Sequence, residues 1–363
     1  MKFRCERDVL LEALGIAGRA VSGRGSLPGL SGVRAQLDGD RLTLTGSDLD
    51  LTISTTVLVN GESDGVAVIP ARLASDIVRA VQPGAVSFAA ADETLSIQAG
   101  RSEFSIRLIA GDEFPQLGGL DQTPVSLGSA QLADALKQVV LAASTDDSRP
   151  ILTGVLLAAE ASGIRLVATD SYRLAMRDVS DVSVLDEGQS VLIPSRALGE
   201  LNRVLSQDEV VKLRLGEREA SFEVGSVTLI TRLIEGDFPN YRGLIPDSHP
   251  NTLTVNREEL LDALRRVKLL ARESTPIRIE MSSDGMELVA VTQDVGTARE
   301  SIESRYEGTD LTVAFNPDYL LAGVEVAPAD EITLSTIDEL KPALVRGVGF
   351  DDFLYLLMPV RVS

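Results

Sequence analysis

Apolar residues recur at helical spacing in six stretches of the chain. In the third stretch, Leu132, Leu136 and Val139 fall on one face of a helix. Ser129 and Asn256 are residue types that suit the N-cap, so we expect them to begin the third and fifth helices. The predicted helices span residues 6–21, 71–82, 129–144, 194–207, 256–273 and 316–327.

Short β-prone runs separate these helices, for example residues 52–57 and 221–224. Each third of the chain holds two predicted helices and several such runs. The pattern therefore predicts an α+β protein.

The pattern repeats three times along the chain. Within each set of markers, the spacing between successive copies is 122 to 126 residues. A proline in the first helical turn is a common helix start, because its missing N–H would be unpaired there. The markers are a proline in a turn-like segment (Pro28, Pro150, Pro276), an aspartate that closes a β-prone run (Asp48, Asp170, Asp294), and a proline that opens a helix (Pro70, Pro194, Pro317). We predict three similar domains over residues 1–122, 123–248 and 249–363.

The charge distribution follows this organisation. The formal net charge is -20, which taken alone argues against nucleic acid as a partner. The six predicted helices, however, carry 12 Lys and Arg against 12 Asp and Glu, whereas the rest of the chain carries 22 against 42. Two interpretations stay open: a helical side that tolerates DNA, or helices that simply balance their own charges through i,i+4 pairs.

Several classes of protein are disfavoured by the residues present. The single cysteine, Cys5, and the single histidine, His249, cannot build a Cys/His zinc site or an intramolecular disulfide. There is no phosphate-binding loop, no nucleophile elbow and no H-E-x-x-H motif. We expect no cofactor, no metal and no catalytic residue. The first eight residues are polar and no apolar run is long enough to span a bilayer, so we expect a cytoplasmic protein.

The chain resembles the bacterial DNA sliding clamps, the β subunit of the replicative DNA polymerase III. The resemblance covers nearly the whole chain and rests on the A-T-D-x-x-R-L segment at 168–174, the G-D-F-P-N-Y segment at 236–241 and the M-P-x-R segment at 358–361, together with the threefold repeat. It implies a head-to-tail homodimer in which helices line a ring around duplex DNA and sheets lie outside. It also implies a processivity factor for DNA replication, whose partners are DNA polymerases and the clamp loader.

The resemblance implies two sets of binding residues. Weak phosphate contacts from scattered cations would allow sliding without sequence readout. The predicted DNA-contacting residues are Arg24, Arg72, Arg79, Lys137, Arg149, Arg196 and Arg203. The predicted cleft for partner peptides comprises Leu152, Thr169, Tyr172, Arg173, Leu174, Pro239, Leu244, Tyr319, Leu340, Pro342, Met358, Pro359, Val360 and Arg361.

The same resemblance places the ring interface at Phe104 in the first repeat and at Leu269 and Leu270 in the third. Arg101 is a candidate ion-pair partner of Glu300 across this interface.

Two alternatives stay open. One is a paralogous clamp that tolerates clamp-directed inhibitors. The other is a DNA-processing enzyme whose metal site uses carboxylates such as Asp146, Asp147, Asp351 and Asp352.

Overall fold

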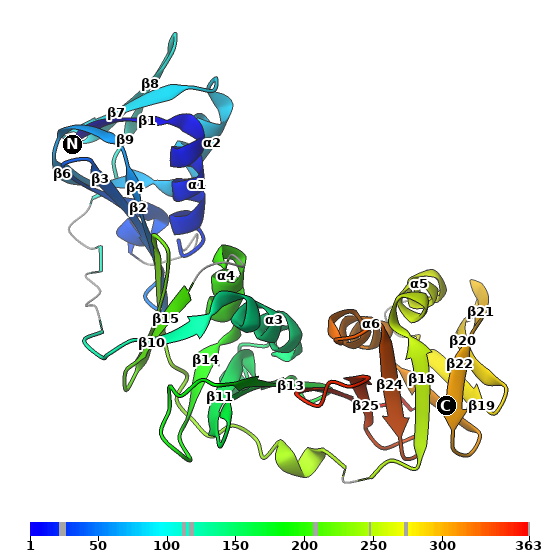
Figure 1. Ribbon diagram of the computed structural model, residues 1–363. Helices are drawn as coiled ribbons and strands as arrows, with labels where there is room; N and C mark the ends of the chain where they lie inside the picture. The colour runs from blue at the N-terminus through cyan, green and yellow to red at the C-terminus, as the bar shows by residue number, and fades with distance from the viewer. Residues whose placement is uncertain are drawn as a thin grey trace. The chain divides into compact units, whose positions relative to one another are not determined.

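The computed structural model describes residues 1–21, 27–110, 114–115, 120–205, 210–246, 248–271 and 275–361. Six α-helices lie within these residues, one at each predicted place (Figure 1). Each ends earlier than predicted, and the third continues as a short 3-10 helix, Val140–Ala142. The helices are α1 (Arg7–Gly18), α2 (Ala71–Ala80), α3 (Ser129–Val139), α4 (Ser195–Val204), α5 (Arg257–Lys268) and α6 (Pro317–Val326). None of these described helices is long and apolar enough to cross a membrane.

The helix starts confirm some predictions and correct others. The Asn256 side chain accepts a hydrogen bond from the Glu259 N–H, as an N-cap should. Ser129 is instead the first residue of α3, and its buried hydroxyl has no hydrogen-bond partner among the described residues, so the prediction that it is the N-cap was wrong. Pro317 is the first residue of α6, as predicted, whereas Pro70 and Pro194 are the last residues of the preceding strands.

Residues 1–130 and 200–233 form one compact unit. It contains a five-stranded antiparallel sheet and an eight-stranded antiparallel sheet, and α1 packs against α2 and against strands β3 and β4. The first sheet has the order β5 (Asn60–Ser63), β1 (Lys2–Glu6), β7 (Ala85–Ala91), β8 (Thr94–Ala99), β9 (Ser102–Arg107). The second has the order β10 (Val125–Gly128), β15 (Val210–Leu215), β16 (Glu219–Val224), β17 (Val227–Arg232), β4 (Leu51–Leu58), β3 (Arg41–Ser47), β2 (Gly32–Asp38), β6 (Gly65–Pro70).

Residues 131–199 and 234–363 form the second compact unit. It contains a nine-stranded and a four-stranded sheet, and α5 packs against α6. The larger sheet has the order β14 (Ser190–Pro194), β11 (Gly154–Glu160), β12 (Gly163–Thr169), β13 (Arg173–Ser180), β26 (Phe353–Leu357), β25 (Ala343–Gly347), β24 (Glu331–Thr336), β18 (Asn251–Asn256), β22 (Ser304–Glu307). The smaller has the order β21 (Gly296–Ile302), β20 (Gly285–Thr292), β19 (Ile277–Ser282), β23 (Leu311–Phe315).

Neighbouring repeats are joined by pairing between strands, and the same kind of pairing occurs at both boundaries. The last strand of the second repeat, β17, pairs with β4 of the first, and Leu229 lies opposite Ile53. The last strand of the third repeat, β26, pairs with β13 of the second, and Tyr355 lies opposite Ala175. One kind of joint is therefore used at both boundaries between repeats.

The same strands reveal where the repeat was misaligned from sequence. Ala168 pairs with Ala175 in the second repeat, and Ala290 pairs with Ala298 in the third. Counting from these pairs, the residue equivalent to Asp170 is Thr292, and Asp294 lies in the following turn. The prediction that Asp294 repeats Asp48 and Asp170 was therefore wrong by two residues. The connection between the paired alanines is also one residue longer in the third repeat, with seven intervening residues against six.

Candidate functional site

A turn between β12 and β13 presents the residues of the predicted cleft. The Asp170 carboxylate accepts hydrogen bonds from the backbone N–H groups of Tyr172 and Arg173, and it also binds the Arg173 guanidinium. Ser171 has a φ of 81°, a left-handed conformation that closes such a turn. As a result the Tyr172 side chain is turned outward and is 59% exposed.

Three aromatic rings and one cation meet beside this turn. The Tyr172 and Tyr319 rings are stacked with centroids 6.4 Å apart, and the Arg173 guanidinium lies 4.4 Å from the Tyr319 centroid. Beneath them, the buried Tyr355 hydroxyl donates to the Tyr319 backbone oxygen at 2.9 Å. The cluster therefore fixes α6 against the β12–β13 turn and leaves Tyr172 as its exposed member.

The electrostatics of the cluster follow from burial. Removal from water raises the pKa of Tyr355 to about 12, although the nearby Arg173 cation opposes this shift. Burial disfavours the charged form of Arg173, but its contacts with Tyr355 and Asp170 outweigh that effect and raise its pKa. Arg173 is therefore a fixed cation, and Tyr355 is a neutral phenol at physiological pH.

Tyr355 is expected to make the stability of the protein depend on pH. Because its folded-state pKa of about 12 exceeds the ordinary value of 10.0, its contribution to stability is complete below pH 10 and is lost as pH rises toward 12. We expect a loss of roughly 2–3 kcal/mol over that window from this group. Urea unfolding at pH 9 and pH 11.5 should show a smaller loss for Tyr355→Phe than for the wild type, and equal losses would contradict the assignment.

The C-terminal segment completes the site. The Met358 N–H donates to the Tyr172 backbone oxygen at 2.9 Å, and the Val360 N–H donates to the Ala314 oxygen at 2.7 Å. These bonds hold the segment between β13 and β23. The exposed apolar side chains of the predicted cleft are Tyr172, Leu244, Leu340, Met358 and Val360.

The predicted cleft residues do not all have the same role. Leu174 is buried and belongs to an apolar cluster that also contains Tyr241, while Thr169 donates its hydroxyl to the Arg173 oxygen. Leu152 and Pro342 are half-buried, and Pro239 is exposed. Leu340, Val360 and Arg361 line one cavity of about 670 Å³. Three residues that shape the turn, the cluster and the cavity were not predicted as site residues: Asp170, which the sequence indicated only as a repeat marker, Tyr355 and Arg278.

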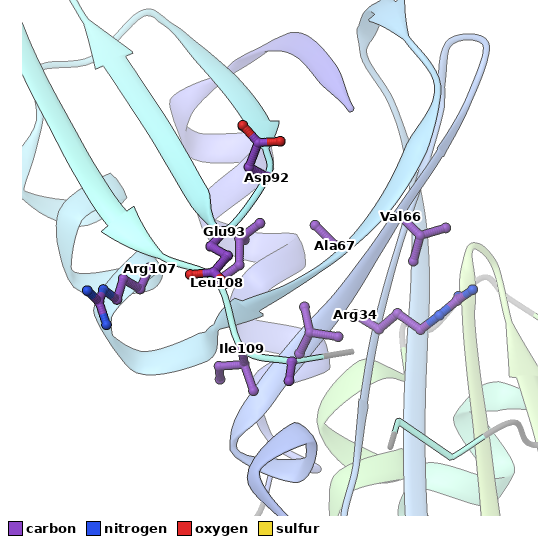
Figure 2. Close-up of a pocket in the computed structure, with 10 residues that line it drawn as sticks. Arg34, Val66, Ala67, Asp92, Glu93, Arg107, Leu108 and Ile109 are labelled. Carbon is purple, nitrogen blue, oxygen red and sulfur yellow. The ribbon is translucent and has the colours of Figure 1, made fainter. Parts of the chain in front are cut away.

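The corresponding region of the first repeat combines apolar residues with four charged ones. Arg34 pairs with Val68 there, at the places that Leu156 and Leu192 occupy in the second repeat. Figure 2 shows the cavity of about 610 Å³ at this position, where Arg34 and Arg107 share the lining with Asp92 and Glu93. The first repeat thus has Arg34 and Val68 where the second has Leu156 and Leu192, and its cavity carries four charged side chains.

Most of the predicted DNA-contacting residues lie on the surface. Arg24 lies outside the described residues. Arg72, Arg79, Lys137, Arg149, Arg196 and Arg203 are all exposed. Arg79 binds Asp76 at 2.9 Å and Arg203 binds Glu200 at 2.8 Å. The Arg79–Asp76 pair is exposed on both sides, and such a pair contributes little and can exchange for phosphate at low cost. The Glu200 side chain is only 14% exposed, so Arg203 is paired with a largely buried carboxylate.

The predicted interface residues lie beside two strand edges. Phe104 is half-buried on β9, and Leu269 after α5 is 83% exposed. Glu300 on β21 already accepts hydrogen bonds from Arg266 of the same chain. Any contact between Glu300 and Arg101 would therefore extend an existing ion pair.

No cluster of His, Cys, Asp or Glu within the described ranges could hold a metal ion.

Comparison with known proteins gives one consistent result. Three family descriptions match the chain: DNA polymerase III beta subunit N-terminal domain at residues 1–118, central domain at 126–240 and C-terminal domain at 242–361. The chain is 31% identical to the beta sliding clamp of Streptomyces coelicolor, covering 100% of both chains. It is also 31% identical to that of Bacillus subtilis, covering 99% of this chain and 100% of the relative.

Solved structures agree. The DNA polymerase sliding clamp from Bacillus subtilis matches with a TM-score of 0.93 and 30% identity, covering 100% of both chains. The sliding clamp from Pseudomonas aeruginosa bound to griselimycin matches with a TM-score of 0.92 and 28% identity, again covering 100% of both. The fold is thus the three-domain DNA clamp fold. The chain belongs to the DNA polymerase III beta subunit family, the beta sliding clamps.

Proposed function

We propose that this chain is a DNA sliding clamp: a head-to-tail homodimer that encircles duplex DNA without reading its sequence. It would hold the replicative and other DNA polymerases on the template and be placed there by a clamp loader. The observation that carries the proposal is that the same strand pairing joins neighbouring repeats twice within the chain. One strand of each kind is left over, paired on one side only. These strands, β9 and β21, end their sheets.

The free edges of β9 and β21 are of the two kinds that pair at the joints within the chain. β9 is the last strand of the first repeat, equivalent to β17, and β21 of the third repeat is equivalent to β4 and β13. Pairing β9 of one protomer with β21 of its partner would reproduce the joint a third time and satisfy the exposed edges. A heterologous contact of this kind closes into a ring when its rotation allows. Two protomers with three repeats each would then place six similar domains around the DNA.

The register of the proposed joint follows from the two existing joints. Phe104 of β9 is equivalent to Leu229 of β17, because each is the third residue of its strand. Phe104 pairs with Ile97 of the preceding strand, as Leu229 pairs with Phe222. Ala298 occupies the position of Ile53 and Ala175. Phe104 should therefore lie opposite the partner's Ala298. The neighbouring pair would be Glu103 and the partner's Arg299, which have opposite charges.

Engineered cysteines test this register. We expect Ser105→Cys combined with Thr297→Cys to form a disulfide between protomers, because these two positions should lie opposite each other across the joint. The native Cys5 is buried, and burial raises the pKa of its thiol, so it should not interfere. Non-reducing electrophoresis after mild oxidation reports the covalent dimer.

The matched control moves one cysteine by one residue. Ser105→Cys with Ala298→Cys places the two side chains on opposite faces of the joint, because side chains alternate along a strand. This pair should remain uncrosslinked. Equal crosslinking of both variants, or of neither, would contradict the proposed register.

The remaining functional assignments form part of the same proposal. The exposed cations of α2, α3 and α4, with Arg149, would touch phosphates, and the Tyr172 turn with the C-terminal segment would bind partner peptides. We infer domain boundaries near 122 and 248, a location in the cytoplasm, and no catalytic activity. The lack of a catalytic motif in the sequence supports the last of these.

A further inference from the structure

The cavity beside the C-terminal segment reaches beyond the predicted cleft. Its volume is about 670 Å³. Leu340, Val360 and Arg361 connect it to the cleft, whereas Arg278 of β19 and Thr312 of β23 extend it along the four-stranded sheet. A peptide lying across Leu340 and Val360 would therefore reach residues that the cleft itself does not include.

One wall of this cavity is an open strand edge. β23 ends its sheet, and only its β19 side is paired with another strand. The Val360 N–H binds the Ala314 oxygen on the outer side, so Ala314 directs its backbone groups toward the cavity. Thr312, two residues away, directs its N–H and C=O to the same side. The Val360 contact occupies the edge at Ala314. An extended segment could continue the sheet beyond it, at Thr312, by strand addition.

Two arginines, Arg278 and Arg361, line the same cavity. Within the described residues, neither the Arg278 nor the Arg361 guanidinium has a hydrogen bond or an ion pair. Guanidinium groups bind carboxylates through paired hydrogen bonds, and these are stronger than bonds between neutral groups. Glu339, the one acid among the lining residues, would repel a second carboxylate.

We propose that this cavity binds a single acidic residue of the partner peptide, in an extended segment that pairs with the free edge of β23. Arg278 and Arg361 hold its carboxylate, and Leu340 and Val360 contact the apolar side chains that precede or follow it. This inference rests on the proposed function of the cleft. It adds a charge preference that the apolar surface alone cannot supply.

Selection from random peptides tests the proposal without assuming a partner. A phage-displayed library of 12-residue peptides is selected on the full-length wild-type protein, on Arg278→Ala and on the control Arg305→Ala. Arg305 is exposed on β22 and does not line the cavity. We expect one Asp or Glu at a fixed spacing from apolar residues on the wild type and on Arg305→Ala, and no such enrichment on Arg278→Ala.

Binding of the most enriched peptide, labelled with fluorescein, then gives the size of the effect. Arg278→Ala should weaken binding about tenfold, the size expected for losing a hydrogen-bonded charge pair. Changing the acidic residue of the peptide to its amide should weaken binding to the wild type similarly and leave Arg278→Ala nearly unaffected, as in a double-mutant cycle.

The possible failures are distinguishable. Peptides that share apolar residues but no acidic position, and that bind Arg278→Ala as tightly as wild type, would overturn the charge preference and leave the cleft intact. Failure of the wild type to enrich any peptide would overturn both the cleft and the cavity.

Discussion

Replacing Gly323 by alanine is expected to lower the free energy of unfolding by about 3 kcal/mol, the upper part of the range for overpacked cores. Gly323 lies in α6 where the helix crosses Tyr355, and a Cβ at this position would come within 2.3 Å of two ring carbons. The ring cannot yield easily, because it is fully buried and its hydroxyl is held by the Tyr319 oxygen. The helix would have to move away from the sheet.

The consequences should extend to the cleft, since a displaced α6 would carry Tyr319 away from Tyr172 and Arg173. Urea denaturation followed by circular dichroism measures the loss of stability. Gly15→Ala in α1 is the matched control, because a Cβ there meets nothing within 4 Å. We expect Gly15→Ala to stabilise the protein by roughly 0.5–1 kcal/mol. A Gly323→Ala variant as stable as Gly15→Ala would contradict the packing described for α6.

Leu269→Asp is expected to dissociate the dimer while the protomer stays folded. Leu269 follows α5 beside the unpaired edge of β21, and its exposure of 83% means that the isolated chain gains nothing from it. An aspartate buried at the proposed interface would cost about 2 kcal/mol per site. A head-to-tail ring contains the interface twice, so the dimer dissociation constant should rise about 1,000-fold.

Sedimentation equilibrium measures this change directly. Leu58→Asp is the control, because Leu58 is 73% exposed at the end of β4 and belongs to neither proposed edge. That variant should remain as dimeric as the wild type. A Leu269→Asp protein that stays dimeric would place the interface elsewhere.

Regular features of the chain could be predicted from the sequence for clear physical reasons. Three of the six helices were predicted from their amphipathic pattern, and the other three from a proline that recurs at the helix start. The threefold repeat was predicted because its markers keep nearly one period. The helix ends were less accurate, because hydrogen-bond geometry and not residue type decides where a helix begins. Ser129 illustrates this: it suits an N-cap yet lies inside α3.

The site was only partly predictable, because it depends on contacts between distant segments. Tyr355 lies in an apolar run, and nothing local indicates that its hydroxyl supports the backbone of Tyr319. Arg278 alternates with the buried Ile277 and Ile279 and resembles any solvent-facing strand residue. It becomes a candidate ligand only when the segment at Val360, far along the chain, encloses the same cavity.

The central claim, that the protein encircles DNA as a closed ring, is tested most directly by comparing its retention on circular and on linear DNA. The protein is loaded onto nicked circular plasmid with its clamp loader, and its co-elution with the DNA is compared before and after the plasmid is linearised. A closed ring predicts retention on the circle and loss on linearisation, because enclosure and not affinity holds the protein. Retention on both forms would indicate ordinary DNA binding and would contradict the sliding ring.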